Sequence, residues 1–309
     1  MSPAQAPCGD PRFEPLRHAT APARFDLAGV DPRGRPFSAA ALGNGKGGKN
    51  GKNGNGTTTA RDRDAEREAD RDAEREAVDA LALELQALQN LLYADGRFAL
   101  LVVLQGMDAS GKDGTIRGVF GQMNALGVHA TSWKVPTETE RGHDFLWRIH
   151  QRTPARGEVA LFNRSHYEDV LVPVVAGTLK GRALKARYRA INDFERMLVD
   201  EGTVILKFML HISKDEQRER LQARLDDPAK HWKFSLGDLA VRERWEDYQK
   251  AYAQAISATG TPWAPWIVVP ADNKTHRNRM IATRVAQALR GLGLREPTGD
   301  PSLNGIVVR

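Results

Sequence analysis

The chain has 309 residues, of which 41% are hydrophobic and 27% charged, and it carries a formal net charge of +6. These proportions are typical of a soluble globular protein, and no apolar run approaches the roughly 20 residues of a membrane span, which excludes a membrane-spanning protein. Cys8 is the only cysteine, so an intrachain disulfide is excluded. With no secretory signal at the N-terminus, we expect a cytoplasmic protein. The basic excess favours polyanionic partners.

Residues 1–60 are predicted to form an extended and flexible N-terminal arm. Pro and Gly are scattered through 1–42 with little periodicity. The run 43–59 is a low-complexity linker of Gly, Asn, Lys and Thr, which cannot bury apolar area.

A charged helix is predicted to follow the arm. The unit Arg-Asp-Ala-Glu-Arg-Glu-Ala occurs at 63–69 and again at 71–77, and its acidic and basic side chains can pair at helical spacing. An apolar stripe then appears at Leu81, Leu85, Leu88 and Leu92. The helix should therefore begin in solvent and end packed against the domain.

Beyond residue 97 the pattern changes to alternating strands and helices. The run 98–104 is continuously apolar and predicts a buried parallel strand. Further strands are predicted at 129–135, 158–162, 203–212 and 266–269. Helices are predicted at 112–126, 143–152, 184–200, 213–225, 236–257 and 276–292. This alternation indicates a three-layer α/β domain with a parallel central sheet. We assign 61–295 to this domain and 296–309 to a C-terminal tail.

The first candidate site lies between the 98–104 strand and the next helix. Gly106 to Lys112 fits the pattern G-x-x-x-x-G-K of a P-loop in the context that the motif requires. Glycines allow the backbone to curl so that its N–H groups surround a phosphate, and the helix N-terminus adds positive charge. Lys112 supplies a point charge for the terminal phosphates. The phosphate-binding residues predicted here are Gly106, Ala109, Ser110, Gly111, Lys112, Asp113, Gly114 and Thr115.

One position departs from this pattern. The residue after Lys112 is normally Ser or Thr, whose hydroxyl binds Mg²⁺, whereas here it is Asp113. Thr115 lies two residues further on, and whether it or Asp113 contacts a phosphate or the metal stays open. Asp108, inside the loop, is the preferred metal ligand, with a role in turn stabilisation as the alternative.

A second candidate site follows the strand at 158–162. Asn163, Arg164 and Glu168 should face the same crevice as the loop, because ligands lie beyond the carboxyl ends of parallel strands. Arg164 could hold phosphate with its planar fork, and Glu168 could bind metal or contact a nucleotide. The alternative is a simple helix start in which Ser165 and Glu168 form a capping box. His166 is interpreted as a surface histidine.

A basic, proline-broken stretch at about 218–238 resembles a lid. Phosphoryl transfer needs cations that neutralise charge and exclude water, and Arg224, Lys230 and Lys233 are the candidates. The alternative is a solvated connector in which Trp232 packs on the core.

Together, these segments resemble the polyphosphate kinase 2 family. The resemblance runs in order through six segments, at 104–116, 143–148, 162–171, 224–234, 245–248 and 262–272. It implies a P-loop kinase fold like that of thymidylate kinase, with a helical lid. It also implies phosphoryl transfer from inorganic polyphosphate to a nucleoside mono- or diphosphate with Mg²⁺, or with Mn²⁺ in its place.

The resemblance further implies which residues take part. Asp108, Lys112 and Arg164 would be catalytic, Asn163, Arg164 and Glu168 would bind the nucleotide, and Asp108 and Glu168 would hold metal. The Asn-Arg-Ser-His-Tyr-Glu run at 163–168 is similar to the third class of the family, which uses AMP and ADP. Adenine nucleotides, with guanine nucleotides as an alternative, are the expected acceptors. A homo-oligomer is expected, and neither a membrane nor a nucleic acid is an expected partner.

Two other functions remain as alternatives at this point. The first is an ATP-dependent kinase of the nucleoside-monophosphate type, whose loop and lid would look similar. The second is a nucleic-acid-binding protein with a degenerate P-loop.

Overall fold

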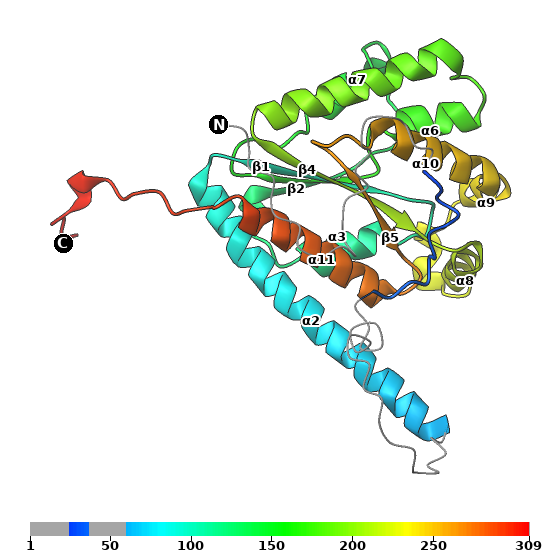
Figure 1. Cartoon of the computed structure of the whole chain (residues 1–309), viewed down its shortest axis with the longest axis horizontal. Coiled ribbons are helices and arrows are strands. Elements are labelled where there is room, and N and C mark those ends of the chain that lie inside the picture. The colour runs from blue at the N-terminus through cyan, green and yellow to red at the C-terminus, as the bar shows by residue number, and fades with distance from the viewer. Residues whose placement is uncertain (1–24, 37–59, 309) are drawn as a thin grey trace, which may run out of the picture.

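The computed structural model describes residues 25–36 and 60–308 and arranges them around a five-stranded sheet (Figure 1). The predicted linker at 43–59 lies outside the described residues. All neighbouring strands are parallel, in the order β2-β3-β1-β4-β5. Their bounds are β1 Ala99–Gln105, β2 Val128–Ser132, β3 Val159–Asn163, β4 Thr203–His211 and β5 Trp266–Pro270. The five predicted strands are thus confirmed to within a few residues at each end.

β1 is the central strand, and every one of its seven residues is buried. It pairs with β3 on one side and β4 on the other, so Leu104 lies opposite both Asn163 and Phe208. Because the strands are parallel, the loops that leave β1, β3 and β4 emerge at the same edge of the sheet. This topology brings segments far apart in the sequence to one place.

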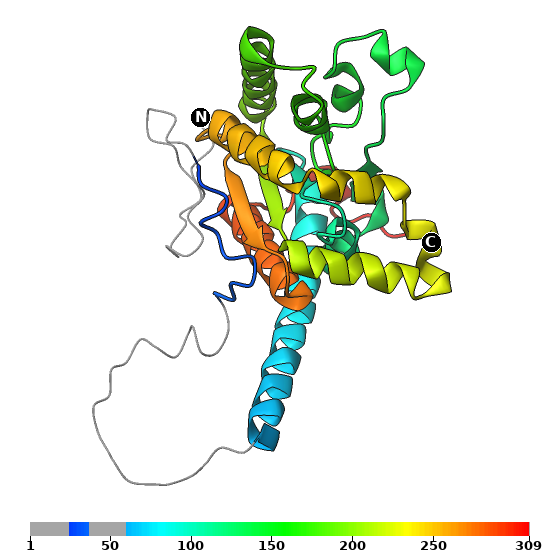
Figure 2. The same ribbon diagram turned by 90° about the vertical axis from the view of Figure 1, so that its right-hand side faces the viewer.

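Helices cover both faces of the sheet (Figures 1 and 2). α2, α3 and α11 pack together on one face, and α6, α7 and α10 pack together on the other. The bounds are α2 Ala60–Asp95, α3 Lys112–Phe120, α6 Glu168–Val175, α7 Gly181–Asp200, α10 Trp245–Thr259 and α11 Lys274–Gly291. The predicted three-layer α/β architecture is confirmed. No helix of the described residues is long and apolar enough to cross a membrane.

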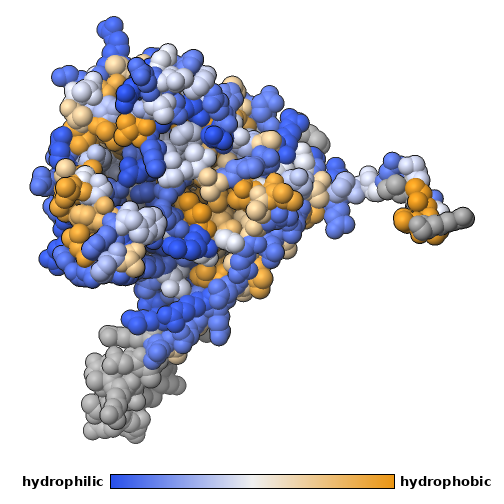
Figure 3. All heavy atoms as spheres, turned by 180° about the vertical axis from the view of Figure 1, so that it is seen from behind, coloured by the Kyte–Doolittle hydropathy of each residue, from blue (hydrophilic) through white to orange (hydrophobic). Residues whose placement is uncertain are grey.

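α2 behaves as its sequence predicts. Leu85 and Leu92 are fully buried, and Leu81 and Leu88 pack against the core. The helix extends beyond the body of the molecule at its N-terminal end (Figure 1), where its described side chains are hydrophilic (Figure 3). Glu74 fixes the helix where it meets the domain, with an oxygen 2.6 Å from Nδ1 of His276.

Part of the predicted arm packs on the domain. Residues 25–36 run beside β5 (Figure 2), where Leu27 is buried and the amide of Asp272 donates to the carbonyl of Pro32 at 3.2 Å. The Phe25 amide also donates to Oγ of Ser257 at 2.8 Å. This short segment therefore belongs to the folded unit.

Three predicted helices differ from those observed. α3 ends at Phe120 instead of continuing to about 126, and Asn124 caps a separate 3-10 turn, η2 Ala125–Gly127. The helix predicted at 143–152 is replaced by two short ones, α4 Glu138–Arg141 and α5 Trp147–His150. The α4 helix begins earlier because Thr137 and Glu140 form a capping box.

The helix predicted at 236–257 is broken at Arg244. α9 Leu236–Glu243 has no buried residue, whereas α10 buries Trp245, Ala251, Tyr252 and others against the domain. The backbone of Arg244 leaves helical geometry, which lets the chain turn from an exposed helix into a packed one. The remaining elements are α8 Lys214–Leu225, the 3-10 turn η3 Pro228–Lys233 and η4 Pro301–Leu303.

A fully buried charged cluster lies beneath α6 and α7. Nζ of Lys207 donates to Glu195 at 2.6 Å, to the Tyr167 hydroxyl at 2.9 Å and to the Thr259 carbonyl at 2.8 Å. Although burial opposes ionisation, Lys207 holds the pKa of Glu195 below its usual value. The ring of His166 is fully buried as well, with Nε2 3.3 Å from Glu195. The interpretation of His166 as a surface residue is therefore wrong, because Glu195 supplies the polar partner that burial requires.

The buried pair predicts a large stability effect. Replacing Lys207 by Met leaves the Glu195 charge buried without its partner, which should lower the free energy of unfolding by about 3–5 kcal/mol. The double variant with Glu195→Leu should recover part of this loss. Urea denaturation measures both, and a loss below about 1 kcal/mol for Lys207→Met would contradict the assignment of a buried ion pair.

Candidate active site

The loop between β1 and α3 curls around the N-terminus of α3. Gly106, Ala109 and Gly111 all have positive φ angles, of 152°, 62° and 103°. Among the described residues, the non-glycine residues with positive φ are Ala109 and Arg164, and both belong to the predicted site. Backbone of this kind costs about 1–3 kcal/mol per residue and persists where surrounding contacts enforce it.

Two glycines of the loop are required by close packing. A Cβ on Gly106 would lie 2.6 Å from the carbonyl oxygen of Leu210. A Cβ on Gly111 would lie 1.9 Å from Nη1 of Arg277, which occupies that space. The sequence pattern therefore reflects contacts made by β4 and α11 as well as the curvature of the loop.

Lys112 folds back over the loop. Its side chain is buried, and Nζ donates to the carbonyls of Gly106 at 2.7 Å and Met107 at 3.2 Å. Burial, and then the neighbouring charge of Arg164, lower the pKa of Lys112 to about 8. The ammonium group of Lys112 therefore lies at the mouth of the loop, and it loses its proton at a pH only slightly above neutral.

Arg164 joins the two predicted sites. It follows β3, and its guanidinium donates to Asp108 of the loop and, at 3.2 Å, to Glu168 at the start of α6. Burial raises the pKa of Glu168, and Arg164 opposes that rise. The structure thus brings Asp108, Arg164 and Glu168 into one charged cluster, as the adjacency of β1 and β3 requires.

The capping-box interpretation of this segment is wrong. α6 begins at Glu168 with no side-chain cap, and the Glu168 carboxylate accepts from Arg164. Ser165 instead accepts from the amide of Tyr167 at 3.2 Å, in a turn before the helix.

Asn163 and Asp113 contact each other across the site. The Asn163 amide donates to Asp113 in the first turn of α3. Thr115 is fully buried, and its hydroxyl lies 3.4 Å from Oδ1 of Asn278, away from the cavity. Of the two residues left open by the sequence, Asp113 therefore borders the cavity and Thr115 does not.

A cavity of about 530 Å³ opens over the loop and collects the predicted cations. Arg224, Lys230 and Lys233 all line it from the side of α8 and η3, and Arg164 and Lys112 line it from the sheet. Among the described residues, nine basic side chains border it against three acidic ones, Asp108, Asp113 and Asp238. The basic ones are Lys112, Arg117, Arg164, Arg220, Arg224, Lys230, Lys233, Lys274 and Arg277.

The segment predicted to be a lid corrects one alternative. Trp232 is 79% exposed and lines the cavity, so it does not pack on the core. Nζ of Lys233 lies 4.8 Å from the centre of its ring. Arg224 donates to the Lys233 carbonyl at 3.0 Å, which ties η3 to α8.

Three further side chains at the loop were missed by the sequence reasoning. Gln217 and Arg220 of α8 and Arg277 of α11 donate to the carbonyls of Asp108, Ala109 and Ser110. Burial, with the nearby charge of Arg220, lowers the pKa of Arg277 to about 9. No local motif marks these residues, because their roles arise only when α8 and α11 fold against the loop.

The carboxylates of the site fit a metal ion that takes most of its ligands from substrate phosphates. No group of three or more His, Cys, Asp or Glu side chains in the described residues could hold an ion by itself. Mg²⁺ usually binds one or two carboxylates together with substrate phosphates and water. Asp108 lines the cavity and suits this role. Glu168 does not line the cavity, and its carboxylate accepts a hydrogen bond from Arg164, which does.

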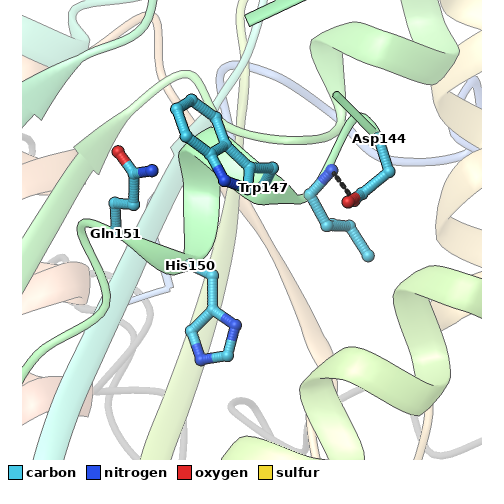
Figure 4. A pocket seen from close by; sticks show the side chains of 5 residues that line it. Asp144, Trp147, His150 and Gln151 are labelled. Atoms are coloured by element: carbon cyan, nitrogen blue, oxygen red, sulfur yellow. Dashed lines mark hydrogen bonds between the residues drawn. The ribbon is translucent and has the colours of Figure 1, made fainter. Parts of the chain in front are cut away.

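A second hollow of about 350 Å³ lies on the segment around α5. Figure 4 shows Trp147, His150 and Gln151 beside it, with Asp144 turned back to accept from the amide of Leu146 at 2.9 Å. It shares no residue with the cationic cavity and lacks a comparable group of cations. Of these two cavities, the one over the loop carries the group of basic side chains that a phosphate-binding site needs.

Known proteins share much of this sequence. The sequence model of the Polyphosphate kinase 2 family matches residues 68–293. The AMP/ADP-polyphosphate phosphotransferase of Meiothermus ruber is 52% identical over 235 residues, which are 75% of this chain and 88% of the relative. The ADP-polyphosphate phosphotransferase of Rhodopseudomonas palustris is 43% identical over 230 residues, covering 71% and 80%.

A solved structure agrees with the fold. The crystal structure of Polyphosphate Kinase 2 from Arthrobacter aurescens TC1 is 42% identical in sequence and superposes with a TM-score of 0.73. The similarity covers 97% of this chain and 93% of that one. The expected P-loop kinase fold is thereby confirmed.

The depressed pKa of Lys112 predicts a pH effect on anion binding. Sulfate, which keeps its charge from pH 7 to 8.5, should bind more weakly as pH rises through about 8, because Lys112 then loses its proton while Arg277, with a pKa of about 9, stays mostly charged. Loss of one charged hydrogen bond should lower the affinity for sulfate by about tenfold. Isothermal titration calorimetry at a series of pH values measures the affinity for sulfate. In Lys112→Arg the decline should disappear, and a decline that persists in this variant would assign the effect to another group.

Proposed function

This chain belongs to the polyphosphate kinase 2 family, and we propose that it transfers the terminal phosphoryl group of inorganic polyphosphate to AMP and ADP. The observation that carries the proposal is the charge of the cavity over the P-loop, which nine basic and three acidic side chains line in the part of the chain that the structure describes. A long polyanion matches this excess of cations, which extends from the loop across α8 and η3. The names of the relatives support the same donor and acceptors.

The P-loop residues would bind the reacting phosphates. Lys112 lies at the mouth of the loop, where its ammonium can exchange loop carbonyls for phosphate oxygens. The transition state of phosphoryl transfer is loose and spreads negative charge over the transferred oxygens, so positioning and charge neutralisation supply most of the catalysis. Direct in-line transfer needs no covalent enzyme intermediate.

Arg164 would neutralise charge between donor and acceptor. It lies beside Asp108 of the loop and 3.2 Å from Glu168, which fixes its fork at the edge of the cavity. Asn163, held by Asp113, borders the same space and would contact the acceptor nucleotide. Glu168 would contribute to binding of the acceptor nucleotide indirectly, by orienting the guanidinium of Arg164.

Mg²⁺, with Mn²⁺ as the alternative, would be held by Asp108 together with substrate phosphates. When bound, such an ion neutralises phosphate charge and polarises the phosphoryl oxygens. Arg224, Lys230 and Lys233 would bind the polyphosphate chain on the far side of the cavity, where all three line it.

The decisive experiment uses polyphosphate as the only donor. The purified protein is incubated with polyphosphate, Mg²⁺ and either AMP or ADP, and ADP or ATP formation is followed by chromatography. We expect product with both acceptors and a loss of about 10³-fold or more in Lys112→Ala, in line with removal of a phosphate-neutralising cation. GDP tests the guanine alternative.

The outcome separates the rival functions. Product formed from AMP with ATP, but not with polyphosphate, would identify a nucleoside-monophosphate-type kinase. No product with either donor, combined with nucleic-acid binding that Lys112→Ala leaves intact, would identify a nucleic-acid-binding protein.

The cationic cavity also predicts a strong salt dependence. Raising the salt from about 50 to about 200 mM should increase the KM for polyphosphate by about tenfold or more, because several cations bind one polyanion and its counterions must be displaced. The KM for AMP, which carries two charges, should change much less. Steady-state kinetics at constant Mg²⁺ measures both, and a salt-insensitive KM for polyphosphate would contradict this binding mode.

A further inference from the structure

Arg220 lines the cationic cavity, and its position alone would assign it to phosphate binding. Its hydrogen bonds indicate a different role. The guanidinium has five N–H donors, and it makes five hydrogen bonds within the protein. Nε donates to Glu216 at 2.7 Å, Nη1 to the carbonyls of Ala109 and Ser110, and Nη2 to those of Ala271 and Asp272. No donor is left for a phosphate oxygen.

These contacts connect three separate parts of the chain. Arg220 itself belongs to α8, its Nη1 partners belong to the P-loop, and its Nη2 partners form the turn between β5 and α11. The side chain is only 10% exposed, so the contacts are shielded from water. The planar fork can serve four carbonyls at once, which an ammonium on a flexible stem cannot do.

The contacts also set the orientation of the loop peptides. A trans peptide places its C=O and the following N–H on opposite sides. Because Arg220 and Arg277 hold the Ser110 carbonyl from one side, the N–H of Gly111 is turned to the other. Gln217, fully buried and outside the cavity lining, holds the Asp108 carbonyl at 2.9 Å in the same way.

We propose that Arg220 is a positioning residue, which holds the P-loop in its phosphate-binding shape and fixes α8 to it, and that it does not bind phosphate. The proposal rests on the proposed function, since its effect is read in phosphoryl transfer. Arg224, one turn further along α8, offers the contrast. Within the described residues, Arg224 donates to the Lys233 carbonyl and, at 3.4 Å, to Asp238, which leaves donors available to a substrate.

The test compares conservative variants of the two arginines. Arg220→Lys keeps the charge but loses the fork, and we expect kcat to fall by about 100-fold, the effect of misplacing reacting groups by about 1 Å. The slope of log KM for polyphosphate against log salt should stay as in the unchanged protein, because no phosphate contact is lost. Arg224→Met should instead raise KM and reduce that slope, with kcat changed little.

Arg218→Lys is the matched control, since Arg218 is exposed on the same helix and does not line the cavity. A kcat for Arg220→Lys within about threefold of the control would overturn the proposal, as would a reduced salt slope in Arg220→Met. If the protein without substitutions shows no activity with polyphosphate, the proposed function is wrong. That result differs from a failure of the Arg220 proposal, in which the unsubstituted protein is active and the variants behave otherwise than expected.

A second variant covers the case in which the Arg220 variants do not fold, as judged by thermal unfolding. Gln217→Met removes a loop contact from a side chain that cannot reach substrate. It should lower kcat about tenfold with an unchanged salt slope, and an unchanged kcat would overturn the proposal.

Discussion

Crowding of like charge is the constraint on which this site depends. Nine basic side chains of the described residues border one cavity. Burial, and then the charge of a neighbouring arginine, lower the pKa of Lys112 to about 8 and that of Arg277 to about 9. The protein compensates largely with backbone carbonyls, which accept from Lys112, Arg220, Arg224 and Arg277. A carbonyl satisfies a donor without cancelling its charge, so the cavity remains strongly positive toward an anion.

Sheet topology decides which residues share this cavity. β1 lies between β3 and β4, so the P-loop after β1 meets Arg164 after β3 on one side. On the other side it meets α8, which follows β4, and α11, which follows β5. The first group carries charge that faces the cavity. The second group also borders the cavity, and its Gln217, Arg220 and Arg277 hold the carbonyls of the loop. The same edge of the sheet thus supplies both the binding groups and their support.

Local patterns predicted the binding groups, including Arg224 of α8, and not the side chains that hold the loop. Gly106 to Lys112 and the run from Asn163 to Glu168 could be found because strand, loop and helix signals coincide there with chemically informative side chains. Gln217, Arg220 and Arg277 lie within ordinary helices, and only tertiary contacts give them a role. His166 was misplaced for the same reason, since Glu195, 29 residues away, makes its burial favourable. Breaks such as that at Arg244 depend on which helix finds a surface to pack on, and helical periodicity does not record this.

The attachment of α8 also has a mechanical consequence. With Gln217 and Arg220 bonded to the loop and Arg242 of α9 bonded to the Lys214 carbonyl, neither helix can swing outward without losing several hydrogen bonds. A hinge between the end of α8 and the start of α9, in the stretch that holds Pro228 and the exposed Trp232, would leave these hydrogen bonds intact. The cavity would then open by movement of the roughly ten residues between α8 and α9, which would let an unbranched chain enter along its length.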